Sequence, residues 1–246
     1  MRNPLPGFPA CLLLALTMAP ALPAHAGSGG GSGLGATWHN PFAPCEGTCA
    51  AHVFAGRQTT TSPGMAFGIA DATEGDWGLV LPTPVWNFDW KGSAIAGFAF
   101  SRDLVDVDWN GSDLFGIEAE LGAGQRFGTQ TEAEAWAALY LRWKRFPWND
   151  VVKTSFAIST GLSYATGISD YEREVSGNDE GSRLLHFFSP ELTFALPDRP
   201  DRELVFRMHH RSGIKSKGEN GPAGFEMFNY TDTGATYATL GLRWHF

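Results

Sequence analysis

The side chains in this sequence with the clearest chemical potential are His210 and Ser212, in the segment ELVFRMHHRSG at residues 203–213. Side chains on a β-strand alternate between its two faces, so residues two apart share a face and lie about 7 Å apart at their Cα atoms. An imidazole and a hydroxyl at that spacing can act as general base and nucleophile. The same pair can also mark the polar end of an apolar face, and taken alone the residues favour that plainer interpretation.

The segment 203–213 has one apolar face and one charged face. Leu204, Phe206 and Met208 share a face with His210 and Ser212. The opposite face carries Glu203, Arg207, His209 and Arg211. This pattern is typical of a strand with lipid on one side and a polar interior on the other. By the same alternation, His209 and Arg211 belong to the charged interior.

Seven other segments repeat the alternation, at roughly the length that spans a bilayer as a tilted strand. They are residues 51–57, 93–101, 114–124, 134–145, 152–164, 184–196 and 236–246. The apolar stretch 77–90 contains Pro82 and Pro84, which cannot donate to a strand ladder, so we assign it to the first loop. The pattern predicts an all-β fold, an eight-stranded antiparallel barrel over residues 50–246.

The second face of these segments indicates which kind of barrel to expect. A soluble ligand-binding barrel has an apolar interior and would bind a small apolar molecule. Here the second face carries groups that can neutralise one another inside a narrow lumen: Glu118, Glu120, Arg142, Lys144, Glu191, Arg207 and Arg243. The chain ends in LRWHF, which resembles the C-terminal signal that the barrel-assembly machinery of bacteria reads. We therefore predict a transmembrane barrel in a Gram-negative outer membrane, and keep the soluble barrel as an alternative.

Loop lengths provide an independent test of this prediction. Outer-membrane barrels have short periplasmic turns and longer external loops. The predicted periplasmic connections, 106–113, 147–150 and 197–201, are short and rich in turn-forming residues. Three of the four predicted external connections are long; the four are 58–91, 125–133, 166–183 and 213–235.

The N-terminal region resembles an export signal. Arg2 precedes a leucine-rich run, and Ala24 and Ala26 provide small residues for cleavage after residue 26, so residues 1–26 are predicted to be a secretory signal peptide. A retained anchor is the alternative. Residues 27–49 are predicted to be a flexible N-terminal segment that contains Cys45 and Cys49. In an exported protein these two cysteines favour a local disulfide over a metal pair or a redox motif.

Composition and spacing argue against several partners. A formal charge of −8 disfavours nucleic acid, which selects basic surfaces. The acidic residues within 169–180 have no defined ligand spacing for a divalent cation. We predict neither a metal nor a cofactor.

The eight-strand plan, with His-x-Ser on the seventh strand, resembles the PagL-type lipid A 3-O-deacylases, also called outer-membrane acyloxyacyl hydrolases. The resemblance is specific only towards the C-terminal end of the chain. It implies an esterase that removes the ester-linked acyl chain at the 3-position of lipid A, within lipopolysaccharide of the outer leaflet. It also implies Ser212 as nucleophile, His210 as base, and a carboxylate on the last strand that orients the base.

The sequence departs from that family where the carboxylate is expected. The outer end of the last strand carries Thr236 and Ala238 instead of an acid. The nearest carboxylates are those of Asp232, our first choice, and Glu226. A second candidate partner is His186, which a tight turn around Arg199 would place nearly opposite Ser212.

Other candidate binding groups surround the pair. Gly213 stands where the family often has asparagine, and the backbone around it is the candidate oxyanion donor. Lys215, Lys217 and Arg211 are candidates to bind the phosphates of lipid A. Ordinary solvated loop charge is the alternative for the lysines. Because the strand acid is missing, a non-enzymatic structural or lipid-binding barrel remains the main alternative function.

Overall fold

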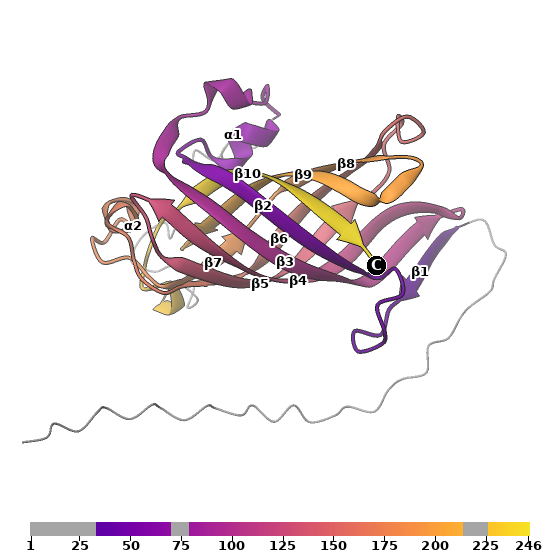
Figure 1. Cartoon of the computed structure of the whole chain (residues 1–246), viewed down its shortest axis with the longest axis horizontal. Helices are drawn as coiled ribbons and strands as arrows, with labels where there is room; N and C mark the ends of the chain where they lie inside the picture. The colour runs from indigo at the N-terminus through magenta and orange to yellow at the C-terminus, as the bar shows by residue number, and fades with distance from the viewer. Residues whose placement is uncertain (1–32, 70–78, 214–225) are drawn as a thin grey trace, which may run out of the picture.

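The computed structural model describes residues 33–69, 79–213 and 226–246 of the 246-residue chain. The predicted signal peptide and residues 27–32 lie outside these ranges. Within them, the strands wrap around one long axis, as Figure 1 shows. None of the helices described is long and apolar enough to cross a membrane.

The described strands include a closed antiparallel ring with eight positions, which confirms the predicted number and order. The last strand of the ring, residues 236–245, pairs with its first strand, residues 49–59, and this pairing closes the ring. In chain order the ring contains β2 (Cys49–Thr59), β3 (Trp90–Trp109), β4 (Ser112–Gly128), β5 (Ala133–Trp143), β6 (Lys153–Ala165), β7 (Leu184–Phe188), β8 (Glu191–Leu196), β9 (Arg199–Ser212) and β10 (Thr236–His245).

One predicted strand, 184–196, is broken into β7 and β8. Both pieces lie between β6 and β9 and so share one position in the ring. Ser189 and Pro190 separate them. Pro190 has no N–H to donate to a ladder, which accounts for the break at this point.

The two ends of the ring differ as predicted (Figure 1). The loop end carries the connections that contain α1 (Pro63–Phe67), η2 (Val85–Asn87), α2 (Asp170–Val175) and η3 (Glu226–Phe228). The turn end carries short hairpins. Asn110 and Gly111 connect β3 to β4, and both have the positive φ that a two-residue hairpin turn requires.

Three predicted boundaries at the turn end need correction. The predicted connection 106–113 is mostly strand, because β3 and β4 continue to the Asn110–Gly111 turn. The turn expected around Arg199 is centred on residues 197–198 instead, and Arg199 already pairs with Leu196. The segment 27–49, predicted to be flexible, contains β1 (Leu34–Trp38), which pairs with the part of β3 nearest this turn.

The predicted disulfide is present, between Cys45 and Cys49, with their Cα atoms 5.2 Å apart. It lies just before β2 enters the ring. Arg102 of β3 donates to the backbone carbonyls of Asn40, Ala43 and Pro44. These hydrogen bonds hold the stretch that leads into β2 against β3.

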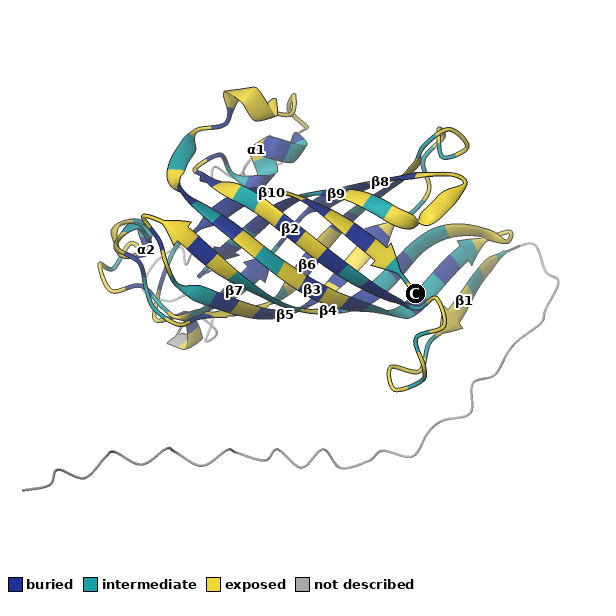
Figure 2. Cartoon of the chain, in the orientation of Figure 1, coloured by how far each residue is buried: buried dark blue, intermediate teal, exposed yellow. Residues whose placement is uncertain are grey.

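The faces of the strands alternate between exposed apolar and buried polar residues, as the banding in Figure 2 shows. Phe98 and Leu121 point outward and are each 64% exposed. Glu191 and Arg207 point inward and are fully buried. The predicted orientation, with apolar rows outward, is therefore confirmed. The alternative of a soluble barrel required the reverse arrangement, with an apolar interior.

Ion pairs fill the interior of the ring. Glu191 is at the centre of one network and accepts from three arginines, Arg142, Arg207 and Arg243. Glu118 pairs with Arg142 and Glu120 with Arg207 in the same network. Lys144 is the exception among the predicted interior groups, because it pairs with Asp106 at the partly exposed turn end.

Candidate functional site

The end of β9 presents His210 and Ser212 on the outer face of the ring, at the loop end. Both side chains are half-buried. Arg207, His209 and Arg211 alternate with them and are buried inside. The same-face placement of His210 and Ser212, on which the esterase hypothesis depends, therefore holds.

The register of the neighbouring strands adds a second imidazole to this face. Ser212 pairs with His186 of β7, and His210 pairs with Thr236 of β10. Side chains directly opposite each other on antiparallel strands have Cβ atoms about 4.5–5.5 Å apart. The predicted placement of His186 opposite Ser212 is thus confirmed, although the turn between the strands is not where we expected it.

Each imidazole is bound by a threonine on an adjacent strand. His210 Nδ1 lies 2.7 Å from Thr236 Oγ1, and His186 Nε2 lies 2.9 Å from Thr160 Oγ1. A hydroxyl can accept a hydrogen bond from Nδ1–H, which leaves the lone pair of His210 on Nε2. Nε2 is then the nitrogen that can serve as a base. Thr236 thus occupies the position at His210 that the family gives to a carboxylate.

Within the described part of the chain, no hydrogen bond joins Ser212 Oγ to His210 or His186. Catalytic hydrogen bonds are often long before substrate binds, so this geometry does not by itself exclude the pair.

Asp232, the first choice among the predicted acids, is hydrogen-bonded elsewhere in the described structure. The backbone N–H of Asp232 donates to Ser176 O at 2.7 Å, and its carboxylate lies against Gly177. Asp232 therefore joins the last loop to the loop that contains α2, which differs from its predicted role. Glu226 opens η3, and its side chain lies outside the described part of the chain.

Gly213 leaves no room for a side chain. A Cβ added there would lie 1.6 Å from the carbonyl oxygen of Thr231. An asparagine at this position would not fit without a shift of this loop. The backbone at Gly213 therefore differs from what the resemblance implies.

The predicted phosphate-binding groups are only partly placed. Arg211 is fully buried, and it donates to the carbonyls of Ser182 and Arg183. Its Nε also lies 3.4 Å from Glu172 of α2. Arg211 thus secures a loop from inside the ring, and the prediction that it binds phosphate at the rim is wrong. Lys215 and Lys217 lie outside the described residues.

A cluster beneath the site fixes the inner face of β9. His209 Nε2 lies 2.9 Å from Glu134, which also pairs with Arg126. Arg126 reaches Glu172 at 3.1 Å, so α2 is tied to the same cluster. The inward position of His209 was predicted from the alternation, but these partners were not. A site held on a strand with a locked opposite face is positioned more precisely than one on a free loop.

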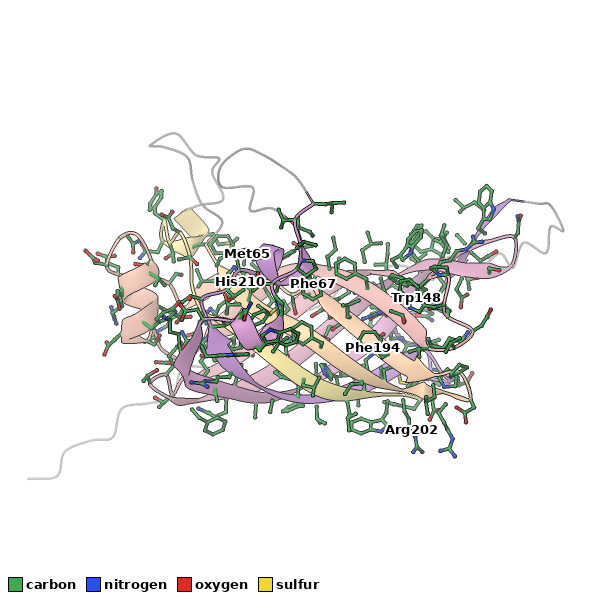
Figure 3. All side chains as sticks on the ribbon, turned by 90° about the horizontal axis from the view of Figure 1, so that it is seen from above. Met65, Phe67, Trp148, Phe194, Arg202 and His210 are labelled. Atoms are coloured by element: carbon green, nitrogen blue, oxygen red, sulfur yellow. A yellow bond between two sulfur atoms is a disulfide. The ribbon has the colours of Figure 1, made fainter. Side chains whose placement is uncertain are left out.

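Helix α1, which was not predicted from the sequence, packs on the outer wall beside the site. Ala66 contacts a buried cluster that includes Met208, two residues from His210 on the same face. Figure 3 shows α1, with Met65 and Phe67, at the end of the wall that carries His210. A local signal was present. Ser62 caps the N-terminus of the helix, Pro63 is its first residue, and Gly68 ends it in the left-handed conformation.

No group of three or more His, Cys, Asp or Glu side chains in the described ranges is placed to hold a metal ion. No protein-family model matches this sequence, and no curated protein matches it significantly. The geometry of the site is therefore the main basis for assigning a function to this chain.

Proposed function

We propose that this chain is an outer-membrane β-barrel and a serine esterase that hydrolyses an ester-linked acyl chain of lipopolysaccharide. The observation that carries the proposal is the grouping of Ser212, His210 and His186 on the outward face of the wall, at the loop end. An ester within an outer leaflet would approach the ring from that side.

Three features of the ring support the membrane part of the proposal. Apolar side chains form its exposed outer rows, and a continuous exposed apolar surface marks contact with lipid or with another protein. Charged groups fill its interior. Long connections gather at one end and short turns at the other, as in barrels of bacterial outer membranes. With a lumen filled by side chains, the ring is not a pore.

The proposed reaction is acyl-ester hydrolysis. His210 Nε2 takes the proton from Ser212 Oγ as this oxygen attacks the ester carbonyl. The imidazolium then gives the proton to the departing hydroxyl oxygen of the sugar. In the second half of the cycle His210 takes a proton from the water that attacks the acyl-enzyme, and returns it to Ser212 Oγ as the fatty acid leaves. Thr236 Oγ1 holds Nδ1 and so keeps the ring oriented. Backbone N–H groups near Gly213 are the candidate oxyanion donors, worth about 3–4 kcal/mol each in other hydrolases.

His186 is the second imidazole beside Ser212, so it competes with His210 for the role of base. Its Nε2 is bound to Thr160, whereas the threonine at His210 binds Nδ1 and leaves Nε2 for Ser212, which favours His210. Replacing each histidine separately with glutamine distinguishes them. The base is the residue whose loss removes hydrolysis, and the other histidine affects only substrate binding.

The direct test is mass spectrometry of lipid A from cells that express the full chain in their outer membrane. We expect loss of one hydroxyacyl chain, and restoration of the full lipid by Ser212→Ala or His210→Ala. Ser112→Ala is the matched control, because Ser112 is an exposed serine at the turn end. Unchanged lipid A, with heat-modifiable migration showing that the barrel has folded, would refute the esterase.

A second candidate function is a non-enzymatic barrel that binds lipid or has a structural role. Two observations favour it: no carboxylate contacts His210 in the described part of the chain, and Ser212 is not hydrogen-bonded to an imidazole there. In that case Ser212→Ala would change nothing in the cell, while immobilised lipopolysaccharide would still retain the protein.

A further inference from the structure

The outward row that leads to the candidate site is not uniformly exposed. On β9, Leu204 is 44% exposed. Met208, four residues later on the same face, is fully buried. On β10, Leu240 is 56% exposed and Ala238 only 7%. Something therefore covers the outer wall just below His210, on both strands.

The cover comes from the described parts of the connection between β2 and β3, residues 60–69 and 79–89. Ala66 of α1 and Phe88 pack against Met208 and Ala238. The ring of Phe67 lies 5.9 Å from that of Phe206. Phe67 also reaches across β8 to Phe156 of β6, at 5.5 Å between ring centroids. The described parts of this connection thus cross the outside of β10 and β9, and Phe67 extends the cover to Phe156 of β6.

Hydrogen bonds fix both ends of the cover. Thr60 N–H donates to Asp89 O at 3.0 Å, and Asp89 N–H donates to Thr61 Oγ1 at 3.1 Å. Within it, Thr83 N–H donates to Met65 O at 2.9 Å, which ties the returning chain to α1. Residues 60–69 and 79–89 are therefore held against the wall as a unit. Their own outer side carries Leu79, Leu81 and Trp86, which are almost fully exposed.

The wall on the other side of Ser212 is open. His186, opposite Ser212, pairs in turn with Leu162 of β6. Leu162 is exposed, as are its outward neighbours Tyr164, Ile158 and Leu139. From Ser212 an apolar surface therefore continues sideways over β6 and β5, whereas the surface over β9 and β10 is filled by α1.

We propose that α1 sets the acyl specificity of the candidate esterase. Phe67 and Ala66 exclude the scissile acyl chain from β9 and β10, so the chain lies over β6 and contacts Leu162. This inference rests on the proposed function. A chain confined to one surface is selected by its fit to that surface, so Leu162 is the residue on the open side and Phe67 the residue on the closed side.

The test uses the purified full-length protein in detergent micelles, with 3-acyl glucosamine phosphate esters of short, medium and long acyl chains. We expect Leu162→Trp to lower kcat/KM for the long chain about tenfold relative to the short one, the scale of discrimination by an apolar pocket. Phe67→Ala should raise the relative kcat/KM of the long chain. Val53→Trp is the control, because Val53 is an exposed residue of β2, half-way around the ring from β6.

A second measurement separates this inference from the proposed function. Ether analogues of the same substrates are titrated against Ser212→Ala protein with and without Leu162→Trp, and Kd is measured for each chain length. If wild-type protein hydrolyses the esters but neither variant alters the dependence on chain length, the role of α1 is refuted and the esterase stands. If no ester is hydrolysed, the esterase fails, and a Kd unaffected by Leu162→Trp rejects the binding surface as well. Phe67→Leu, which keeps most of the packing, replaces Phe67→Ala if that variant does not fold.

Discussion

His209 and His210 are adjacent in the chain, but they lie on opposite faces of β9 in contrasting surroundings. His209 is fully buried, bound to Glu134 and surrounded by the rings of Phe54, Trp136 and Phe187. His210 is half-buried on the outer wall, with Thr236 at Nδ1. The comparison shows that the face of the strand determines the role of a histidine. His209 stabilises the interior, whereas His210 is available for the proposed chemistry on the outer wall.

The largest expected effect is on the outer face. His210→Ala should reduce ester hydrolysis by about 10⁴-fold, the scale seen when a triad member is removed. The midpoint of thermal unfolding should stay close to wild type, since the imidazole is partly exposed. The measurement is the initial rate on a lipid A ester, normalised to folded protein by heat-modifiable migration. Equal rates for the two proteins would remove His210 from the mechanism.

On the inner face the largest effect should come from Glu134. This carboxylate binds Arg126, His209 and Ser163. Glu134→Gln keeps the shape but removes the charge, which leaves buried Arg126 with fewer counter-charges. Breaking a buried ion pair costs about 3–5 kcal/mol. The check is the free energy of unfolding from urea titration in detergent. The control is Glu132→Gln, because Glu132 is more exposed and 4.0 Å from Arg126.

His209→Ala should destabilise the fold by about 1–3 kcal/mol, since Glu134 loses a hydrogen bond and the aromatic cluster loses packing. Per folded molecule, hydrolysis should be unchanged. Urea titration and the rate assay are done on the same preparation as His210→Ala, so the two adjacent substitutions are compared directly. If His209→Ala lost activity and kept stability, the division between the two faces of β9 would be incorrect.

The two faces also differ in how far sequence could predict them. Alternation of apolar and charged residues was sufficient for the ring, for the inward charges and for the outward placement of His210. His186 was placed opposite Ser212 from a turn assumed around Arg199. The turn lies at residues 197–198, and the register shift between Ala195 and Leu196 keeps His186 opposite Ser212. Thr236 was not found as the partner of His210, because that contact depends on an exact register between two strands. The packing of α1 on Met208 was missed for a similar reason, since nothing local indicates which distant surface a short helix covers.

Thr236→Val tests the outer face more finely. Valine keeps the shape of threonine but cannot bind Nδ1, so the imidazole loses its orientation. We expect hydrolysis to fall about tenfold, the worth of one hydrogen bond of roughly 1.4 kcal/mol. Thr236→Ser should retain most of the rate, because it restores the hydroxyl. If valine and serine behaved alike, packing rather than the hydrogen bond would explain Thr236.

The smallest expected effect lies at the turn end. There the ion pair of Asp106 with Lys144 is partly exposed, whereas the pair of His209 with Glu134 is buried. Burial raises the pKa of Asp106, but hydrogen bonds from Lys144 and His39 outweigh it and hold the pKa below its ordinary value of 3.8. A carboxylate with a lowered pKa in the folded state stabilises that state at neutral pH, and the contribution is lost as pH falls through the folded value. His39 follows β1, so acid should release β1 from β3 before it opens the ring.

Hydrogen exchange of residues 34–39, measured between pH 7 and pH values below 3.8, should show protection that is lost on the acid side. In Asp106→Asn the same residues should exchange faster at neutral pH, with a weaker dependence on pH. The opposite result, with residues 34–39 protected in acid and residues of the ring exchanging, would show that the buried ion pairs are more sensitive to acid than the partly exposed pair at Asp106.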